Sequence, residues 1–176
     1  VIPVDFSGLP CAAREIRALA DRYGFKILRD ASHATGARAD GKPVGSEFAD
    51  ATVFSFHAVK IVTTAEGGII TTHDKMLAHK LRLLRSHGMT RDPVDMVAPA
   101  EGPWYYEQVA LGFNYRITDV QAALGLSQLA RLDSMQSRRV ELADRYDQLL
   151  SGLPLRLPAR IDGYQSSWHL YVVEVD

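Results

Sequence analysis

Residues 55–60, Ser-Phe-His-Ala-Val-Lys, contain groups that could do chemistry together. Lys60 follows Ser55 by five positions at the end of an apolar, strand-like run, and a pair of glycines comes soon after. Thirty residues before Lys60, Asp30 also ends an apolar run. Pyridoxal phosphate (PLP) chemistry requires an amine that forms a Schiff base, a hydroxyl that binds phosphate, and a carboxylate that keeps the pyridine nitrogen protonated. The pattern therefore indicates a PLP site.

Each of these residues also has an ordinary structural interpretation. Lysines near a serine and two glycines occur on many protein surfaces. Asp30 could be a turn residue that follows a strand, and Ser55 could be a hydroxyl of the core. The surrounding elements therefore matter, since they decide whether the groups can meet.

Helical and strand-like patterns alternate along the chain, which is typical of an α/β protein with a mostly parallel sheet. Helices are predicted over residues 10–24, 74–86, 119–132 and 133–150, and strands over 25–28, 51–56, 68–72 and 168–175. Ligands of such sheets bind at the carboxyl ends of the strands. Because Asp30 and residues 55–60 both follow strand ends, we expect them to share one crevice.

The composition restricts the class of protein. The chain has 176 residues, 47% of them hydrophobic, which is enough for one core, and its net charge of −1 does not favour nucleic acid or an acidic membrane surface. Its single cysteine, Cys11, excludes an intrachain disulfide and fits a reducing compartment. No apolar run approaches the roughly 20 residues that span a bilayer, the first residues do not resemble a signal peptide, and the histidines form no metal-site pattern. We expect a cytoplasmic protein without a metal ion.

Three segments, residues 30–34, 55–68 and 111–116, resemble the DegT/DnrJ/EryC1/StrS family of PLP-dependent sugar aminotransferases. These are fold-type-I enzymes that act on nucleotide-linked keto-sugars, and the resemblance runs along the whole chain. Residues 85–92 and 102–106 look most like the branch that aminates a UDP-linked 4-keto-6-deoxy-N-acetylhexosamine on the route to pseudaminic acid.

The resemblance implies a role for five residues. Lys60 would be the Schiff-base lysine and proton carrier, and Asp30 would pair with the pyridine nitrogen. His33 would contact the phenolic oxygen of the cofactor, and Ser55 would bind its phosphate. Asn114 would reach the phosphate of the neighbouring subunit's cofactor, so that the active unit would be a homodimer. His33 could instead be structural, and Asn114 could be a turn or capping residue.

The resemblance also implies that the chain is the central half of a longer protein, cut at both ends. Residues 1–150 would belong to the large PLP-binding domain, and residues 151–176 would begin the small C-terminal domain. The family's phosphate loop and ring-stacking aromatic precede the matched region, so this chain by itself should be inactive. The complete enzyme would transfer an amino group to the sugar with glutamate as donor. Alternatives are another fold-type-I enzyme, such as a lyase, and a non-catalytic binding or regulatory protein. Arg29 stands where the family often has an acidic residue.

Overall fold

The computed structural model describes residues 1–175, which form two compact units. The first unit comprises residues 1–71 and the described chain from Asp119 onward, and the second comprises residues 72–118. The first contains η1 (Phe6–Gly8), α1 (Ala13–Tyr23), β1 (Leu28–Asp30), β2 (Arg38–Ala39), β3 (Lys42–Pro43), β4 (Ala51–Ser55), β5 (Gly68–Thr71), α3 (Asp119–Leu129), α4 (Leu132–Leu150) and β8 (Tyr164–Gln165). The second contains α2 (Lys75–Leu84), β6 (Met89–Thr90) and β7 (Glu107–Gln108).

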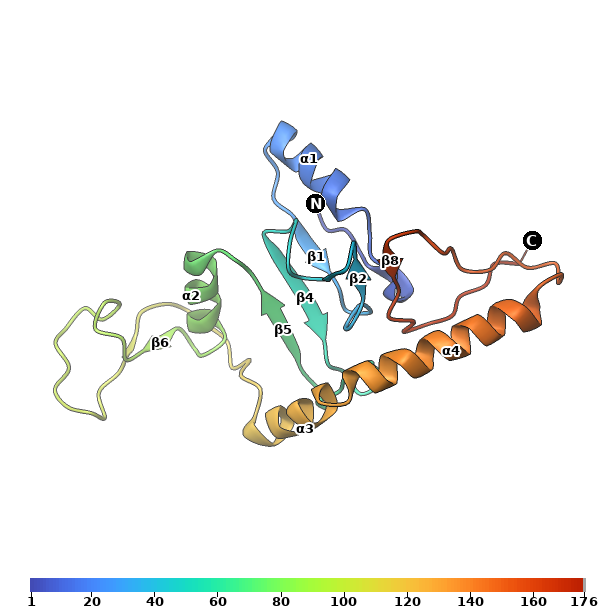
Figure 1. The fold of residues 1–176 in the computed structure, drawn as a ribbon. Helices are drawn as coiled ribbons and strands as arrows, with labels where there is room; N and C mark the ends of the chain where they lie inside the picture. The colour runs from blue at the N-terminus through green and yellow to red at the C-terminus, as the bar shows by residue number, and fades with distance from the viewer. Residues whose placement is uncertain (176) are drawn as a thin grey trace. The chain divides into compact units, whose positions relative to one another are not determined.

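The central sheet of the first unit has the order β1-β4-β5, with β4 in the middle (Figure 1). β1 and β4 are parallel, with Asp30 opposite Val53, whereas β4 and β5 are antiparallel, with Ser55 opposite Gly68. Because β1 and β4 run in the same direction, Asp30 and Ser55 lie at the same carboxyl edge of the sheet. A smaller antiparallel sheet of the same unit has the order β3-β2-β8.

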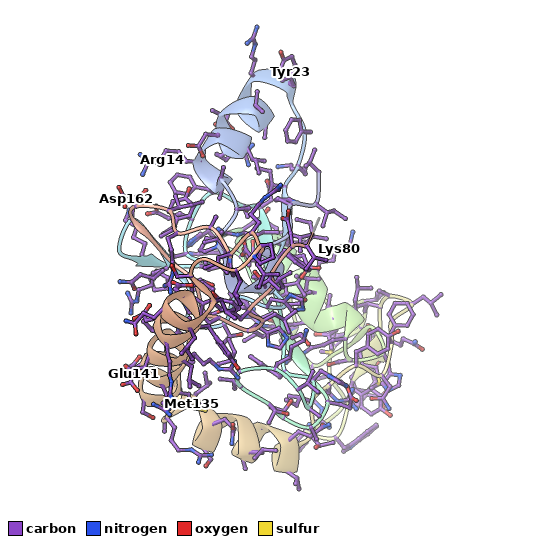
Figure 2. The ribbon with its side chains drawn as sticks, turned by 90° about the vertical axis from the view of Figure 1, so that its right-hand side faces the viewer. Arg14, Tyr23, Lys80, Met135, Glu141 and Asp162 are labelled. Atoms are coloured by element: carbon purple, nitrogen blue, oxygen red, sulfur yellow. The ribbon has the colours of Figure 1, made fainter. Side chains whose placement is uncertain are left out.

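Local sequence signals set the helix boundaries. α1 ends at Gly24, which adopts a left-handed φ of 74° and donates its N–H to the carbonyl of Ala20, so the predicted end of this helix is confirmed. Tyr23, the last residue of this helix, is labelled in Figure 2. α2 begins after Asp74, whose carboxylate accepts hydrogen bonds from the N–H groups of Met76 and Leu77 and so satisfies two donors of the first turn.

The predicted strand over residues 168–175 is wrong. Within the described chain this segment makes only an isolated bridge, between Glu174 and Arg156. Trp168 has a φ of +50°, a left-handed conformation that interrupts an extended chain. The N–H of Leu170 donates to the carbonyl of Ser7 at 3.2 Å, so part of its hydrogen bonding is used outside any sheet. The first strand is also displaced from the prediction and ends at Asp30 itself.

Small side chains build the core beside the carboxyl edge of the sheet. Ala31, Ala34, Ala37 and Val44 are buried together, and Phe54 of β4 packs against them. Since two of these alanines flank residues 32–33, burial fixes the backbone of that turn on both sides. Among the described residues no helix is long and apolar enough to cross a bilayer.

Candidate active site

Lys60 lies in a turn that is closed at its neck by backbone hydrogen bonds. Phe56 donates its N–H to the carbonyl of Gly67 at 2.8 Å, and its own carbonyl accepts the N–H of Thr64 at 2.9 Å. Within the turn, the N–H of Lys60 donates to the carbonyl of His57 at 2.9 Å. These bonds hold the backbone of Lys60 just beyond the end of β4.

The residues that follow Lys60 anchor the turn in the core. Ile61 is 5% exposed and Val62 is fully buried, so the chain cannot shift without exposing apolar surface. Gly68 lies directly against β4, where a Cβ atom would come within 2.8 Å of the carbonyl oxygen of Phe54. Strand pairing therefore requires this glycine, and the close approach is to the neighbouring strand.

Asp30 ends β1 with its carboxylate held by the next turn. Its Oδ1 accepts the backbone N–H of Ser32 at 2.9 Å. Burial, the largest single influence, would raise the pKa of Asp30, but the hydrogen bonds from Ser32 and the charges of His33 and Lys60 together outweigh it, so the pKa lies below its ordinary value. The carboxylate is therefore ionised at neutral pH and lies close enough to Lys60 to interact with its charge.

His33 is held as a neutral ring. Its Nδ1 accepts the backbone N–H of Ser7 at 3.3 Å, and an accepting ring nitrogen carries no proton, so in the neutral ring the hydrogen is on Nε2. Burial lowers the pKa of His33, and the charge of Lys60 lowers it further against the opposing effect of Asp30. The ring therefore offers Nε2–H as a donor.

Ser55 ends β4 beside the Lys60 turn. Its Oγ accepts the backbone N–H of His57 at 3.4 Å. A hydroxyl that accepts one hydrogen bond still has its own O–H to donate. The side chain can therefore donate to an anion at the carboxyl edge of the sheet.

Asn114 belongs to the second unit, where its segment is fixed against the end of α2. Asn114 forms an isolated antiparallel bridge with Ser86. On either side of this bridge, the N–H of His87 donates to the carbonyl of Phe113 at 2.8 Å, and the N–H of Tyr115 donates to the carbonyl of Arg85 at 2.9 Å. The side chain of Asn114 is exposed on this braced segment, which suits a residue that reaches a ligand from a rigid support.

The first unit thus brings together Asp30, His33 and Lys60, with Ser55 at the same sheet edge. It also brings in a residue that the sequence did not single out. The ring of His169 lies 4.5 Å from the ring of His33, centroid to centroid. No pattern in the sequence links two histidines so far apart in the chain, and the incorrect strand prediction hid the contact.

Other reactive groups do not form a second centre in the part of the chain that the structure describes. Over residues 1–175, no three or more histidine, cysteine, aspartate or glutamate side chains are grouped so that they could hold a metal ion. Burial raises the pKa of the Cys11 thiol to about 11, with a further contribution from Asp5. The thiol is therefore protonated at neutral pH and is a poor nucleophile.

The chain matches the DegT/DnrJ/EryC1/StrS aminotransferase family over residues 1–176. It is 44% identical to the spore coat polysaccharide biosynthesis protein SpsC of Bacillus subtilis, over 100% of this chain and 45% of that protein. The chain therefore spans about half the length of the curated relatives it matches.

Two solved structures have a similar fold. Helicobacter pylori PseC, described as an aminotransferase involved in the biosynthesis of pseudoaminic acid, superimposes with a TM-score of 0.90 and 35% identity, over 99% of this chain and 45% of that chain. Spr1654 of Streptococcus pneumoniae in its PLP form gives a TM-score of 0.82 and 32% identity, over 99% of this chain and 47% of that one. These matches confirm the predicted α/β aminotransferase fold.

Proposed function

Because this chain belongs to the DegT/DnrJ/EryC1/StrS aminotransferase family, we propose that it forms the central half of a PLP-dependent sugar aminotransferase. The complete protein would act as a cytoplasmic homodimer and transfer an amino group from glutamate to a UDP-linked 4-keto-6-deoxy-N-acetylhexosamine. The observation that carries the proposal is the position of Lys60 in a hydrogen-bonded turn beyond β4, at the sheet edge where the parallel strand β1 ends at Asp30.

The groups present fit PLP. An ionised Asp30 is the partner that a protonated pyridine nitrogen requires, and the Nε2–H of a neutral His33 can donate to a phenolic oxygen. The hydroxyl of Ser55 can donate to a phosphate. Lys60 supplies an amine on a braced turn. The donor set thus matches each polar part of the cofactor within one unit of the fold.

The division of labour follows from these groups. When bound, PLP supplies an electron sink for the bond broken at the amino-group carbon. Asp30 would hold a proton at the pyridine nitrogen, Ser55 would bind the phosphate, and His33 would donate to the phenolic oxygen, which together would fix the position of the ring. Nζ of Lys60 takes up and returns the proton that moves during transamination. Asn114 of a second subunit would add an amide donor to the phosphate.

The substrate assignment rests on the second unit and on the relatives. Residues 85–92 and 102–106 resemble the branch that acts on the UDP-linked sugar, and the pseudoaminic acid enzyme PseC is among the similar structures. Arg91 of the first segment lies over the ring of Tyr106 in the second, with its guanidinium carbon 6.0 Å from the ring centroid. Within the second segment, Trp104 packs edge-on against Tyr105, with 5.9 Å between the ring centroids. Exposed aromatic rings beside an arginine suit a nucleotide, since bases stack on rings and phosphates pair with a guanidinium.

The domain boundary remains part of the proposal. Residues 1–150 would form part of the large domain, with residues 151–176 starting the small one.

The central sheet has an uncovered strand. Ile69 and Ile70 of β5 are 48% and 44% exposed, and apolar strand residues are normally covered in such a sheet. Their exposure supports additional chain packing over β5 in the complete protein.

The test uses the full-length protein with PLP, glutamate and the keto-sugar nucleotide. We expect 2-oxoglutarate and an amino-sugar nucleotide in equal amounts, measured by mass spectrometry. Lys60→Ala should abolish both products, whereas Lys42→Ala, which removes a lysine paired with Glu47 on the surface, should leave them unchanged. Formation of 2-oxoglutarate without an amino sugar would refute the substrate, and failure of borohydride to fix PLP to the protein would indicate a non-catalytic binder.

A further inference from the structure

His169 covers the ring of His33. The two imidazole rings lie 4.5 Å apart at an interplanar angle of 39°. Two residues before His169, the hydroxyl of Ser167 donates to the carbonyl of His33 at 2.7 Å. The segment that carries His169 is therefore attached both to the ring and to the backbone of His33.

The same segment is fixed to the turn that orients His33. Ser167 donates its N–H to the carbonyl of Gly8 at 3.0 Å, and Leu170 donates its N–H to the carbonyl of Ser7 at 3.2 Å. Ser7 in turn donates its N–H to Nδ1 of His33. A Cβ on Gly8 would overlap the hydroxyl of Ser167, so the two segments lie as close as a glycine allows. Ser7 thus links the imidazole of His33 to the backbone beside His169.

His169 itself is placed where a charge is unfavourable. Its Nδ1 is buried and has no hydrogen-bond partner among the described residues. Burial is the largest cause that lowers its pKa to about 4, and His33, Lys60 and Arg139 act in the same direction. A protonated ring would need an acceptor for each N–H and would face the positive charges of Lys60 and Arg139. His169 is therefore a neutral, flat ring at neutral pH.

We propose that His169 is a positioning residue, whose ring packs against His33 and keeps that imidazole in the tautomer with its hydrogen on Nε2. The inference rests on the proposed function, because the fixed Nε2–H is the donor assigned to the phenolic oxygen of PLP. Without the covering ring, the imidazole of His33 could turn away from the N–H of Ser7 and become more hydrated.

The charges around His33 set the direction of the expected change. Lys60 disfavours a protonated His33, Asp30 favours it, and burial disfavours it most. His169 contributes the neighbouring ring, and Ser7 contributes the N–H that occupies Nδ1. Removing the ring of His169 reduces burial while leaving Lys60 and Asp30 in place, so the pKa of His33 should rise toward its ordinary value.

The first measurement is made on the full-length protein without PLP. Nitrogen-15 histidine NMR, with the His33 signals assigned from a His33→Gln variant, reports the tautomer and the titration midpoint. His169→Ala and the less disruptive His169→Gln should both mix the two tautomers of His33 and raise its midpoint. His169→Phe restores a flat ring without nitrogen atoms and should retain the original tautomer and midpoint. Leu170→Ala, which shortens the exposed neighbouring side chain, should change neither.

The second measurement adds PLP. Loss of one oriented neutral hydrogen bond, about 1 kcal/mol, should weaken PLP affinity roughly fivefold in the Ala and Gln variants, with affinity recovered in the Phe variant. An unchanged tautomer and midpoint in a folded Ala or Gln variant would overturn the proposal, as would a Phe variant that behaves like Ala. Because the tautomer is read without cofactor, a protein that binds no PLP would refute the proposed function while the role of His169 is still decided.

Discussion

The carboxylate of Asp5 and the guanidinium of Arg29, the residue before Asp30, form a buried ion pair. Nε of Arg29 lies 2.9 Å from Oδ2 of Asp5, and Nη2 of Arg29 lies 3.0 Å from Oδ1 of Asp5. The side chain of Arg29 is 3% exposed and that of Asp5 is 0% exposed. Arg29 precedes Asp30 in β1. Asp5 also accepts the N–H of Cys11 at 2.8 Å. The arginine that departs from the family pattern thus has a buried partner, and it fixes the strand that presents Asp30.

Arg29→Met should strongly destabilise the protein. Removing one partner leaves the carboxylate of Asp5 buried without a counter-charge, which typically costs about 3–5 kcal/mol. Adding Asp5→Asn removes that charge and keeps an amide oxygen for the N–H of Cys11, so the double variant should recover most of the loss. Denaturant unfolding of the full-length protein measures each value. Arg14→Met, which breaks an exposed pair with Asp40, is the control and should cost less than about 1 kcal/mol. If Arg29→Met were as stable as the Arg14→Met control, the prediction would be contradicted.

Asp50 should make stability depend on pH in the acid range. A hydrogen bond from Lys26, followed by that from the N–H of Ile27, lowers its pKa to about 2 from an ordinary value of 3.8. A carboxyl whose pKa is depressed by folding stabilises the folded state above its unfolded pKa and loses that contribution as the pH falls through the folded pKa. Asp50→Asn should therefore cost about 1 kcal/mol at pH 7, and the difference from the unmodified protein should disappear between pH 4 and pH 2.

Chemical unfolding at several pH values measures this difference. Asp21→Asn serves as the control, because Asp21 is 70% exposed in its pair with Arg17 and should contribute little. A difference for Asp50→Asn that is the same at pH 2 and pH 7 would show that the charge of this carboxyl does not contribute.

Lys60 should carry the cofactor in the full-length protein. Borohydride reduction of the PLP complex, followed by peptide mapping, should place the phosphopyridoxyl group on Lys60, since its turn is fixed beside Asp30 and His33. Recovery of the label on Lys42, Lys75 or Lys80 instead would rule out the assignment.

Asp30→Asn should still permit attachment of PLP to Lys60 but should lose most turnover. A neutral amide cannot hold the pyridine nitrogen protonated, and loss of such a charge-assisted contact costs on the order of 100-fold or more in rate. Single-turnover absorbance changes with glutamate give the rate of the first half-reaction. Near-normal rates would show that Asp30 does not have this role.

Asn114 should act on the site of the partner subunit. In a mixed dimer of Lys60→Ala and Asn114→Ala subunits, a shared site predicts one intact active site and one that carries both changes, so roughly half of the normal activity is expected if the sites are independent. If Asn114 acts within its own subunit, neither site is intact, and activity should not exceed about half that of the Asn114→Ala homodimer. Differently tagged subunits allow the mixed dimer to be isolated and its mass to be checked before assay.

The sequence by itself determined the features that depend on neighbouring residues. Gly24 ends α1 because a left-handed residue there costs glycine little, and Asp74 caps α2 because its carboxylate reaches N–H groups two and three residues ahead. Strand-like runs before Asp30 and Ser55 predicted their place at strand ends, and the parallel pairing of β1 and β4 puts both at one edge. These are short-range effects, so a local pattern is sufficient to encode them.

Only the tertiary structure decided which distant residues meet. The apolar run after Trp168 resembles a strand, but the left-handed Trp168 and the hydrogen bond from the N–H of Leu170 to the carbonyl of Ser7 prevent one. That packing brings His169 onto His33. The pairing of Arg29 with Asp5 likewise joins segments that no periodic pattern relates. Such contacts depend on how whole segments exclude water and satisfy buried polar groups together, and this cooperative balance is not a property of any local stretch of sequence.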